Sequence, residues 1–125
     1  MNRTLAALAL IAALGACASM NAAPLAAKYD GGIVVDSAGM TLYAFDKDGA
    51  GSGKSACNGP CAMNWPPLHA AASGQASGDW TIVMRDDGSR QWAYKGKPLY
   101  RWIKDQKPGD RTGDGFLKLW HVATQ

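Results

Sequence analysis

An internal repeat constrains this chain more than any other feature of its sequence. Residues 39–48 (GMTLYAFDKD) return at 96–105 (GKPLYRWIKD), 57 residues later. Two further matches follow outside this stretch: Lys54-Ser55 with Arg111-Thr112, and, after a slip of two residues, Trp65 with Trp120. A repeated unit this short buries its apolar face against a neighbouring copy. We therefore expect one domain built from two copies, at about 32–68 and 80–122.

The residues of the repeat indicate β-structure. Thr41, Tyr43 and Phe45 alternate with Leu42 and Ala44, so they project from one face of a strand. Strands are expected, by the same alternation and by turn residues between the runs, at 33–35, 41–45, 80–84, 90–94, 99–103 and 116–122. One short helical turn is predicted to open at Pro60, near the Cys pair. The predicted fold is mostly β: a small antiparallel β domain made of two copies of a hairpin motif.

The start of the chain indicates export. An apolar run of ten residues at 5–14 is typical of a signal peptide and too short for a permanent membrane span. It ends in Leu14-Gly15-Ala16-Cys17, the pattern that lipoprotein signal peptidase cleaves before a lipidated Cys. The expected organisation is a signal peptide at 1–16, a lipidated Cys17 and flexible tether at 17–28, and a duplicated β domain at 29–125.

The residues around Cys17 also bear on location. Ala18 is not Asp, which in a Gram-negative host favours the outer membrane, facing the periplasm. Cleavage at Ala16-Cys17-Ala18, or near Ala22-Ala23, is the alternative and would release a secreted protein. The formal net charge is +3, and the basic residues are interleaved with Asp and form no basic stripe. We therefore expect no nucleic-acid partner.

Cys57 and Cys61 remain as a pair once Cys17 is assigned to lipid. In an oxidising compartment a structural disulfide is expected. A thioredoxin-type site would need two intervening residues in a βαβ setting, and this pair has three. A c-type haem would need a His directly after the second Cys, where Ala62 stands.

Both copies fit the pattern Tyr-x-aromatic-x-x-Asp: Tyr43, Phe45 and Asp48 in the first, and Tyr100, Trp102 and Asp105 in the second. With the Cys pair and Asn64-Trp65-Pro66-Pro67-Leu68, the chain resembles the bacterial family of predicted lipoproteins with a Yx(FWY)xxD motif, also described as a secreted repeat of unknown function. The resemblance covers about 32–122. It implies an exported, often lipid-anchored, duplicated small domain, and it implies no known activity.

The aromatic pairs of the motif have two interpretations. Each pair projects from one strand face, so both pairs can meet in a shared core between the copies. Alternatively they form an exposed platform that stacks on a glycan, with the motif Asp residues hydrogen-bonding the ligand. The solvent exposure of these side chains decides between the two.

Metal binding is the next hypothesis. Copper in the envelope is bound by His and Met, and the domain carries His69 and His121 with three Met residues. No two of them lie at a ligand spacing on one element, and His121 is the first ligand candidate. Residues 46–51 partly match a calcium loop, but Ala50 and Cys57 stand where its fifth and twelfth positions need oxygen ligands.

No nucleophile elbow, catalytic triad or zinc-protease motif is present in the sequence. We therefore expect a protein that is not an enzyme and needs no cofactor. The leading hypothesis is an exported, lipid-anchored cell-envelope protein, a binding or structural module held to the membrane by the lipid on Cys17, with an envelope protein or glycan as partner. The alternatives are a periplasmic redox or metal (copper or haem) handling protein, and a glycan or peptidoglycan binder.

Overall fold

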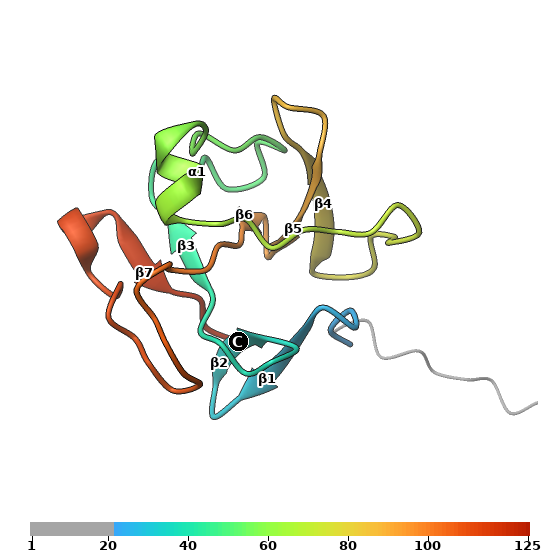
Figure 1. The fold of residues 1–125 in the computed structure, drawn as a ribbon. Coiled ribbons are helices and arrows are strands. Elements are labelled where there is room, and N and C mark those ends of the chain that lie inside the picture. Colours follow the sequence, from blue (N-terminus) through green and yellow to red (C-terminus); the bar gives the residue numbers. More distant parts are fainter. Residues whose placement is uncertain (1–21) are drawn as a thin grey trace, which may run out of the picture.

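The computed structural model describes residues 22–125, so the predicted signal peptide and the lipidation site at Cys17 lie outside the described part. The elements are β1 (Ala27–Asp30), β2 (Ile33–Asp36), β3 (Tyr43–Phe45), α1 (Pro60–Asn64), β4 (Trp80–Met84), β5 (Arg90–Tyr94), β6 (Lys97–Pro98), a 3-10 turn η1 (Phe116–Lys118) and β7 (Trp120–Val122). They form three small antiparallel sheets, β1-β2, β3-β7 and β4-β5-β6 (Figure 1). The predicted fold class is confirmed, including the short helix beside the Cys pair.

Each copy of the repeat begins with a hairpin. In the first copy β1 pairs with β2 from Ala27↔Asp36 inward, and in the second β4 pairs with β5 from Trp80↔Tyr94 inward. The second hairpin turns at residues 85–89, where the Asp87 carboxylate accepts the backbone N–H and the hydroxyl of Ser89. The first turns more tightly, through two glycines with positive φ.

The two copies exchange their last segments. Residues 122–124, from the end of the second copy, lie along the hairpin of the first, where the Val34 N–H donates to the Ala123 carbonyl at 2.9 Å. Residues 67–70, from the end of the first copy, lie along the hairpin of the second, where the Trp92 N–H donates to the Leu68 carbonyl at 2.8 Å. Neither hairpin is therefore completed by its own copy.

A local twofold axis passes between Tyr43 and Tyr100. Their backbones exchange two hydrogen bonds, of 2.8 and 2.9 Å, so the repeat motifs face each other directly. The relation extends outward: the Asp46 N–H donates to the Leu119 carbonyl, and at the equivalent place the Ile103 N–H donates to the Asn64 carbonyl. Corresponding residues thus occupy equivalent places on either side of the axis.

The sequence prediction differs from the structure in four elements. The strand predicted at 99–103 is not formed, because Tyr100 makes isolated bridges to Tyr43 and Pro67 and only residues 97–98 pair with β5. Regular structure begins at Ala27, inside the predicted tether, because Ala27 is buried in the core and the following residues pair with β2. Of the strand predicted at 41–45, only β3 is regular and pairs with β7; Thr41 bridges to β2, and Tyr43 also bridges to Tyr100. The strand predicted at 116–122 is half a 3-10 turn, since Leu117 and Lys118 have positive φ and cannot continue an extended chain.

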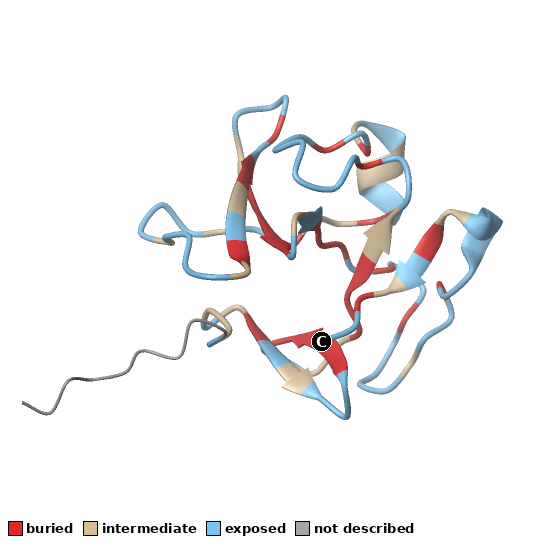
Figure 2. Cartoon of the chain, turned by 180° about the vertical axis from the view of Figure 1, so that it is seen from behind, coloured by how far each residue is buried: buried red, intermediate tan, exposed pale blue. Residues whose placement is uncertain are grey.

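The core has two parts. Between the two hairpins lies an aliphatic and aromatic cluster that includes Val34, Leu42, Trp80, Trp92 and Leu99. The second part holds the motif aromatics and is described below. Figure 2 shows that buried segments follow the strands, whereas the connecting loops are largely exposed. Among residues 22–125, no helix has the length and apolar character needed to cross a membrane.

Candidate functional site

The motif carboxylates bind the tyrosines of the opposite copy. The Tyr43 hydroxyl donates to Asp105 Oδ2, and the Tyr100 hydroxyl donates to Asp48 Oδ2, both at 2.5 Å. Both tyrosine side chains are fully buried and both carboxylates nearly so. The motif Tyr and Asp therefore form two crossed hydrogen bonds that join the copies.

The other carboxylate oxygens are also occupied. Asp48 Oδ1 accepts the Ala56 N–H at 2.6 Å, and Asp105 Oδ1 accepts the N–H and the hydroxyl of Thr112 at 3.0 and 2.6 Å. Burial raises the pKa of Asp48, against the opposing effects of its hydrogen bonds and of Arg85. Burial likewise raises the pKa of both motif tyrosines. Within the described chain, every buried side-chain polar atom has a hydrogen-bond partner.

Arg85 extends this network on one side of the axis only. Its Nη1 donates to Ser55 Oγ at 3.0 Å and to Gln91 Oε1 at 2.7 Å, and its Nη2 donates to the Cys57 carbonyl at 2.7 Å. Ser55 in turn bonds the Tyr100 hydroxyl at 2.7 Å. The guanidinium is thus buried among neutral acceptors, next to the Cys57–Cys61 disulfide, and holds the loop 55–58 against the second hairpin.

The motif aromatics pack around three stacked tryptophans. The Trp65 ring lies between Trp102 and Trp120, with ring centroids 4.0 and 3.8 Å away. Phe45 meets Trp120 edge-on at 4.2 Å. Because the tryptophans are buried and Phe45 is half-buried, the two motif pairs lie in a shared core and do not form an exposed stacking platform.

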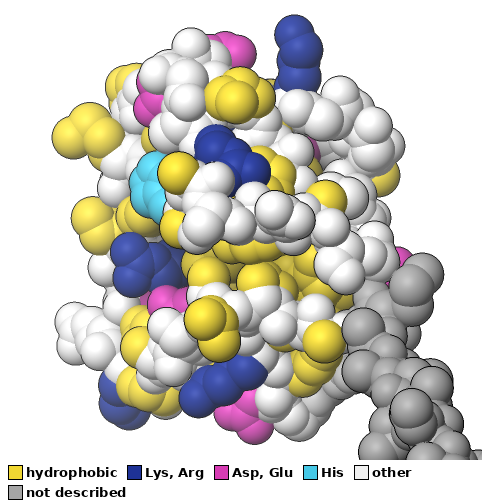
Figure 3. Space-filling model, turned by 90° about the vertical axis from the view of Figure 1, so that its right-hand side faces the viewer, with side chains coloured by type: hydrophobic (Ala, Val, Ile, Leu, Met, Phe, Trp, Pro, Cys, Tyr) yellow, Lys and Arg dark blue, Asp and Glu magenta, His cyan; other side chains and the backbone are white. Residues whose placement is uncertain are grey.

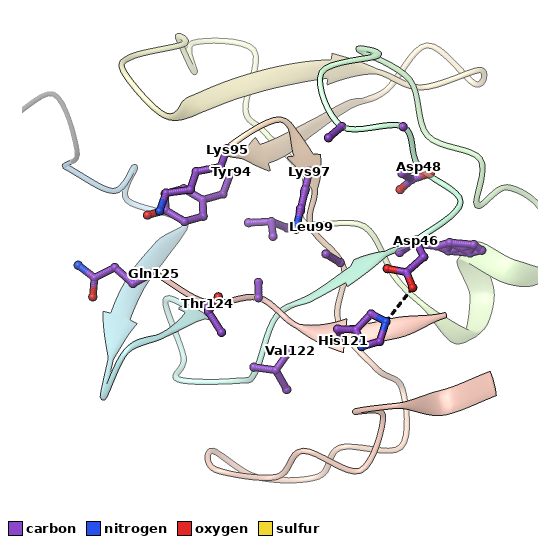
Figure 4. A pocket seen from close by; sticks show the side chains of 15 residues that line it. Asp46, Asp48, Tyr94, Lys95, Lys97, Leu99, His121, Val122, Thr124 and Gln125 are labelled. Carbon is purple, nitrogen blue, oxygen red and sulfur yellow. Dashed lines mark hydrogen bonds and ion pairs between the residues drawn. The ribbon is translucent and has the colours of Figure 1, made fainter. Parts of the chain in front are cut away.

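Next to this core lies a cleft of about 540 Å³, which we name the Lys95–His121 cleft (Figure 4). Its volume is typical of small-molecule sites. The lining residues are Ala44, Phe45, Asp46, Asp48, Gly49, Ala50, Tyr94, Lys95, Lys97, Leu99, His121, Val122, Ala123, Thr124 and Gln125. The buried residues among them are mostly apolar, and the charged side chains other than buried Asp48 are exposed at the rim.

Strand pairing positions two of the rim residues. His121 in β7 is the register partner of Ala44 in β3, and Asp46 follows the end of β3. His121 Nε2 and Asp46 Oδ2 lie 2.8 Å apart, and both side chains are about half exposed. The imidazole is therefore held in place from one nitrogen while its other side remains open to a ligand.

The turn between β5 and β6 positions the other two. Lys95 and Gly96, with φ of 50° and 78°, form a two-residue turn that places Lys95 and Lys97 on either side of the glycine. A Cβ on Gly96 would lie 2.8 Å from the Gly51 backbone nitrogen, so the loop 46–55 packs closely against this turn. The backbone of Lys95 is strained, because its left-handed conformation is rare in residues other than glycine.

The local twofold axis gives this cleft a counterpart. A smaller hollow of about 190 Å³ is lined by Met40, Thr41, Pro66, Arg101, Trp102, Ile103 and Asp105. At the positions equivalent to Lys97, Asp46 and His121 it carries Met40, Ile103 and Pro66. The same backbone arrangement therefore forms without the polar residues of the Lys95–His121 cleft.

A family model described as a secreted repeat of unknown function matches residues 25–69 and 81–124, which are the two copies. The chain belongs to this family of secreted repeats. The search for curated proteins gave no match, and neither did the search for solved structures. The family thus agrees with the resemblance seen in the sequence and supplies no activity.

In this secreted repeat the predicted disulfide between Cys57 and Cys61 is formed. His121, the metal candidate, pairs with Asp46, whereas His69 lies on a segment that bridges to Gln91 in β5. Within residues 22–125, no group of three or more His, Cys, Asp or Glu side chains converges as a metal site would require. Asp46 and Asp48 turn to different partners, so the partial calcium-loop pattern does not gather its carboxylates.

Sequence reasoning missed most of the cleft. Asp46, Lys95 and Lys97 stand in or beside turns, where charged residues are commonplace, and Arg85 has no counterpart in the first copy. The signal that identifies the rim is a comparison of the copies. At an offset of 57, Asp46 corresponds to Ile103, and Lys97 corresponds to Met40. At these positions the side-chain chemistry differs between the copies although the backbone arrangement is shared.

Proposed function

We propose that this secreted repeat protein is a lipid-anchored, non-catalytic binding module of the cell envelope, and that it binds a small ligand in the Lys95–His121 cleft. One observation carries the proposal: the cleft's polar rim consists of residues that the repeat architecture does not require. The counterpart hollow keeps the same fold with Met, Ile and Pro at the equivalent positions. Polar residues that folding does not need, gathered around a cleft of ligand size, support a binding role.

The non-catalytic part of the proposal rests on the motif residues. Both oxygens of Asp48 and of Asp105 accept hydrogen bonds from the protein, and the tyrosine hydroxyls bind these carboxylates. Groups occupied in this way stabilise the join between the copies. The dyad of His121 and Asp46 has no hydroxyl or thiol nucleophile hydrogen-bonded to it among the described residues.

The membrane attachment is proposed from Cys17 and the signal pattern before it. Lipidation of Cys17, with Ala18 after it, supports retention at the outer membrane of a Gram-negative host. The Cys17→Ala variant, or treatment of cells with globomycin, is expected to move the protein out of the membrane fraction. Continued co-fractionation of Cys17→Ala with membranes would contradict the anchor.

Ligand binding is tested separately with a variant that fills the cleft. Ala50 is exposed on the cleft wall, so Ala50→Trp adds an indole ring there without disturbing the core. Native mass spectrometry of protein isolated from its own cell envelope is expected to show a retained small molecule on the wild type and none on Ala50→Trp. Identical spectra for the two proteins would remove the support for a ligand in this cleft.

A further inference from the structure

Two lysine ammonium groups line the Lys95–His121 cleft without an ion pair. Among residues 22–125, neither the Lys95 nor the Lys97 ammonium has a carboxylate within ion-pair distance. The Asp46 carboxylate shares a hydrogen bond with His121, and Asp48 has both oxygens satisfied by the protein. The two ammonium groups beside this turn are therefore cations of the cleft that have no ion pair within the described residues.

The floor below these ammonium groups is apolar. Leu99, Ala123 and Tyr94 are buried there, and half-buried Phe45 and Val122 continue the surface towards His121. In Figure 4 the Lys97 side chain ends near Leu99, the Lys95 side chain lies beside Tyr94, and His121 and Asp46 lie on the opposite side of the cleft from Tyr94. Figure 3 shows one face of the molecule, on which hydrophobic side chains lie inside a hollow that crosses it.

The fold does not account for the lysines. The position equivalent to Lys97 is Met40 in the other copy, and the position equivalent to Lys95 is Ala38. Lys95 also retains a strained backbone at a place where glycine would be relaxed. The Lys95 ammonium lies over the Tyr94 ring, 5.3 Å from its centroid, and among residues 22–125 it has no carboxylate partner. Backbone strain at such a cleft-lining cation points to a role in binding.

Resting on the proposed function, we infer that the cleft's ligand is a small organic anion: an acidic group, carboxylate or phosphate, on an apolar body. The acidic group is bound by the Lys95 and Lys97 ammonium groups, and the apolar body lies on Leu99 and Ala123 towards His121. The His121 imidazole offers the cleft a further hydrogen-bonding group at the far end of that body. Ionic pairing in a partly desolvated site and burial of apolar area both favour such a molecule.

The test uses two fluorescent probes that differ only in charge. 8-Anilinonaphthalene-1-sulfonate carries an anionic group on an aromatic body, and N-phenyl-1-naphthylamine is the same body without that group. The wild-type protein is expected to bind the sulfonate at least about tenfold more tightly. The double variant Lys95→Gln/Lys97→Met is expected to lose that preference, whereas Lys28→Met, on exposed β1 outside the cleft, keeps it.

The outcomes separate the ligand class from the proposed function. Equal affinity for both probes, no binding of the sulfonate, or unchanged sulfonate binding by the double variant would overturn the anionic class. If Ala50→Trp then still abolishes probe binding, the cleft is a binding site for neutral molecules and the proposed function stands. If Ala50→Trp leaves both probes bound, the cleft is not the site and the proposed function falls as well.

The nature of the acidic group is settled by competition. Phenylbutyrate presents a carboxylate on an apolar body, and phenyl phosphate presents a phosphate. Displacement of the bound sulfonate by one of them assigns the acidic group, and displacement by neither, in the presence of wild-type sulfonate binding, would overturn the assignment to carboxylate or phosphate. Near-ultraviolet circular dichroism of every variant checks that the tryptophan stack is intact.

Discussion

The crossed Tyr–Asp hydrogen bonds give the most conspicuous residues of the repeat motif a structural role. Each links a hydroxyl in one copy to a carboxylate in the other, at full burial. A buried hydrogen bond to a charged group contributes about 1.5–3 kcal/mol, and breaking one leaves an unsatisfied partner. The motif is therefore explained by the join between the copies.

Asp48 is expected to make the protein less stable as pH rises. Because burial raises its folded-state pKa above the ordinary 3.8, the folded protein holds the proton more tightly than the unfolded chain. The stability it contributes is complete below about pH 3.8 and is lost as pH rises through the raised pKa. The free energy of unfolding of the wild type, minus that of Asp48→Asn, is expected to fall over this range in urea titrations.

Two carboxyls outside the core act in the opposite direction, so the comparison with Asp48→Asn is essential. Hydrogen bonds lower the pKa of Asp87 and of Asp110, and both stabilise the fold as pH rises from acid values. These contributions are common to both proteins and cancel in the difference. A difference that rises with pH would contradict a buried, charge-disfavoured Asp48.

At the scale of residues, the sequence predicted which residues matter better than it predicted what each of them contacts. It identified the motif residues and the disulfide, since repetition and Cys spacing are visible in one chain. It did not reveal that Asp48 bonds Tyr100 and not Tyr43, because pairing across the axis depends on tertiary structure. Nor could it pick out Lys95 and Lys97, whose importance comes from a cleft that residues 44–50, 94–99 and 121–125 form together.

At the scale of elements, the loop after the second motif is shaped by the tryptophan stack. Gly113 lies against it: a Cβ there would stand 2.7 Å from Trp65 and 3.0 Å from Trp102. Such contacts are closer than packed carbon atoms allow, so the loop or the rings would have to shift. The place of this loop thus depends on the absence of a side chain.

Gly113→Ala is expected to lower the free energy of unfolding by about 1–3 kcal/mol, as overpacking does in cores. The matched control is Gly49→Ala in the equivalent loop of the first copy, where the nearest atom would be Ser52 Cβ at 3.5 Å, an ordinary contact. Neither glycine has a positive φ, so backbone strain does not separate them. Equal effects in thermal unfolding would show that the tryptophan contact is unimportant.

The sequence predicted the elements unevenly for physical reasons. The β4-β5 hairpin was predicted at its observed bounds because it combines alternation with a strong turn. β1 was missed because its four residues (AKYD) carry little apolar pattern and become a strand only through pairing with β2. β3 and the strand that contains β7 were predicted, but their pairing was not, since exchange between the copies leaves no trace in local sequence.

At the scale of the whole molecule, neither copy is a folding unit. β3 pairs with β7, and each initial hairpin is completed by the last segment of the other copy. The exposed loop 71–78 is the chain's passage from one copy to the next. The folded state is therefore stable only when both copies are present together.

Fragments cut in that loop, 22–78 and 79–125, are expected to be unfolded alone at micromolar concentration and to fold when mixed in equal amounts. The reason is that each supplies strands that the other lacks. Two-dimensional NMR, with dispersed amide signals as the sign of folding, measures both states. A folded monomer formed by either fragment alone would contradict the interleaved arrangement.

The local axis through Tyr43 and Tyr100 has the geometry of a symmetric dimer whose subunits have become one chain. Two separate, identical subunits must carry every substitution at both equivalent places. Covalent linkage removes that obligation and also makes the partner's presence independent of protein concentration. A position in one copy can then change while its equivalent in the other copy stays the same. Lys97 in the second copy, where the first copy has Met40, is a difference of this kind.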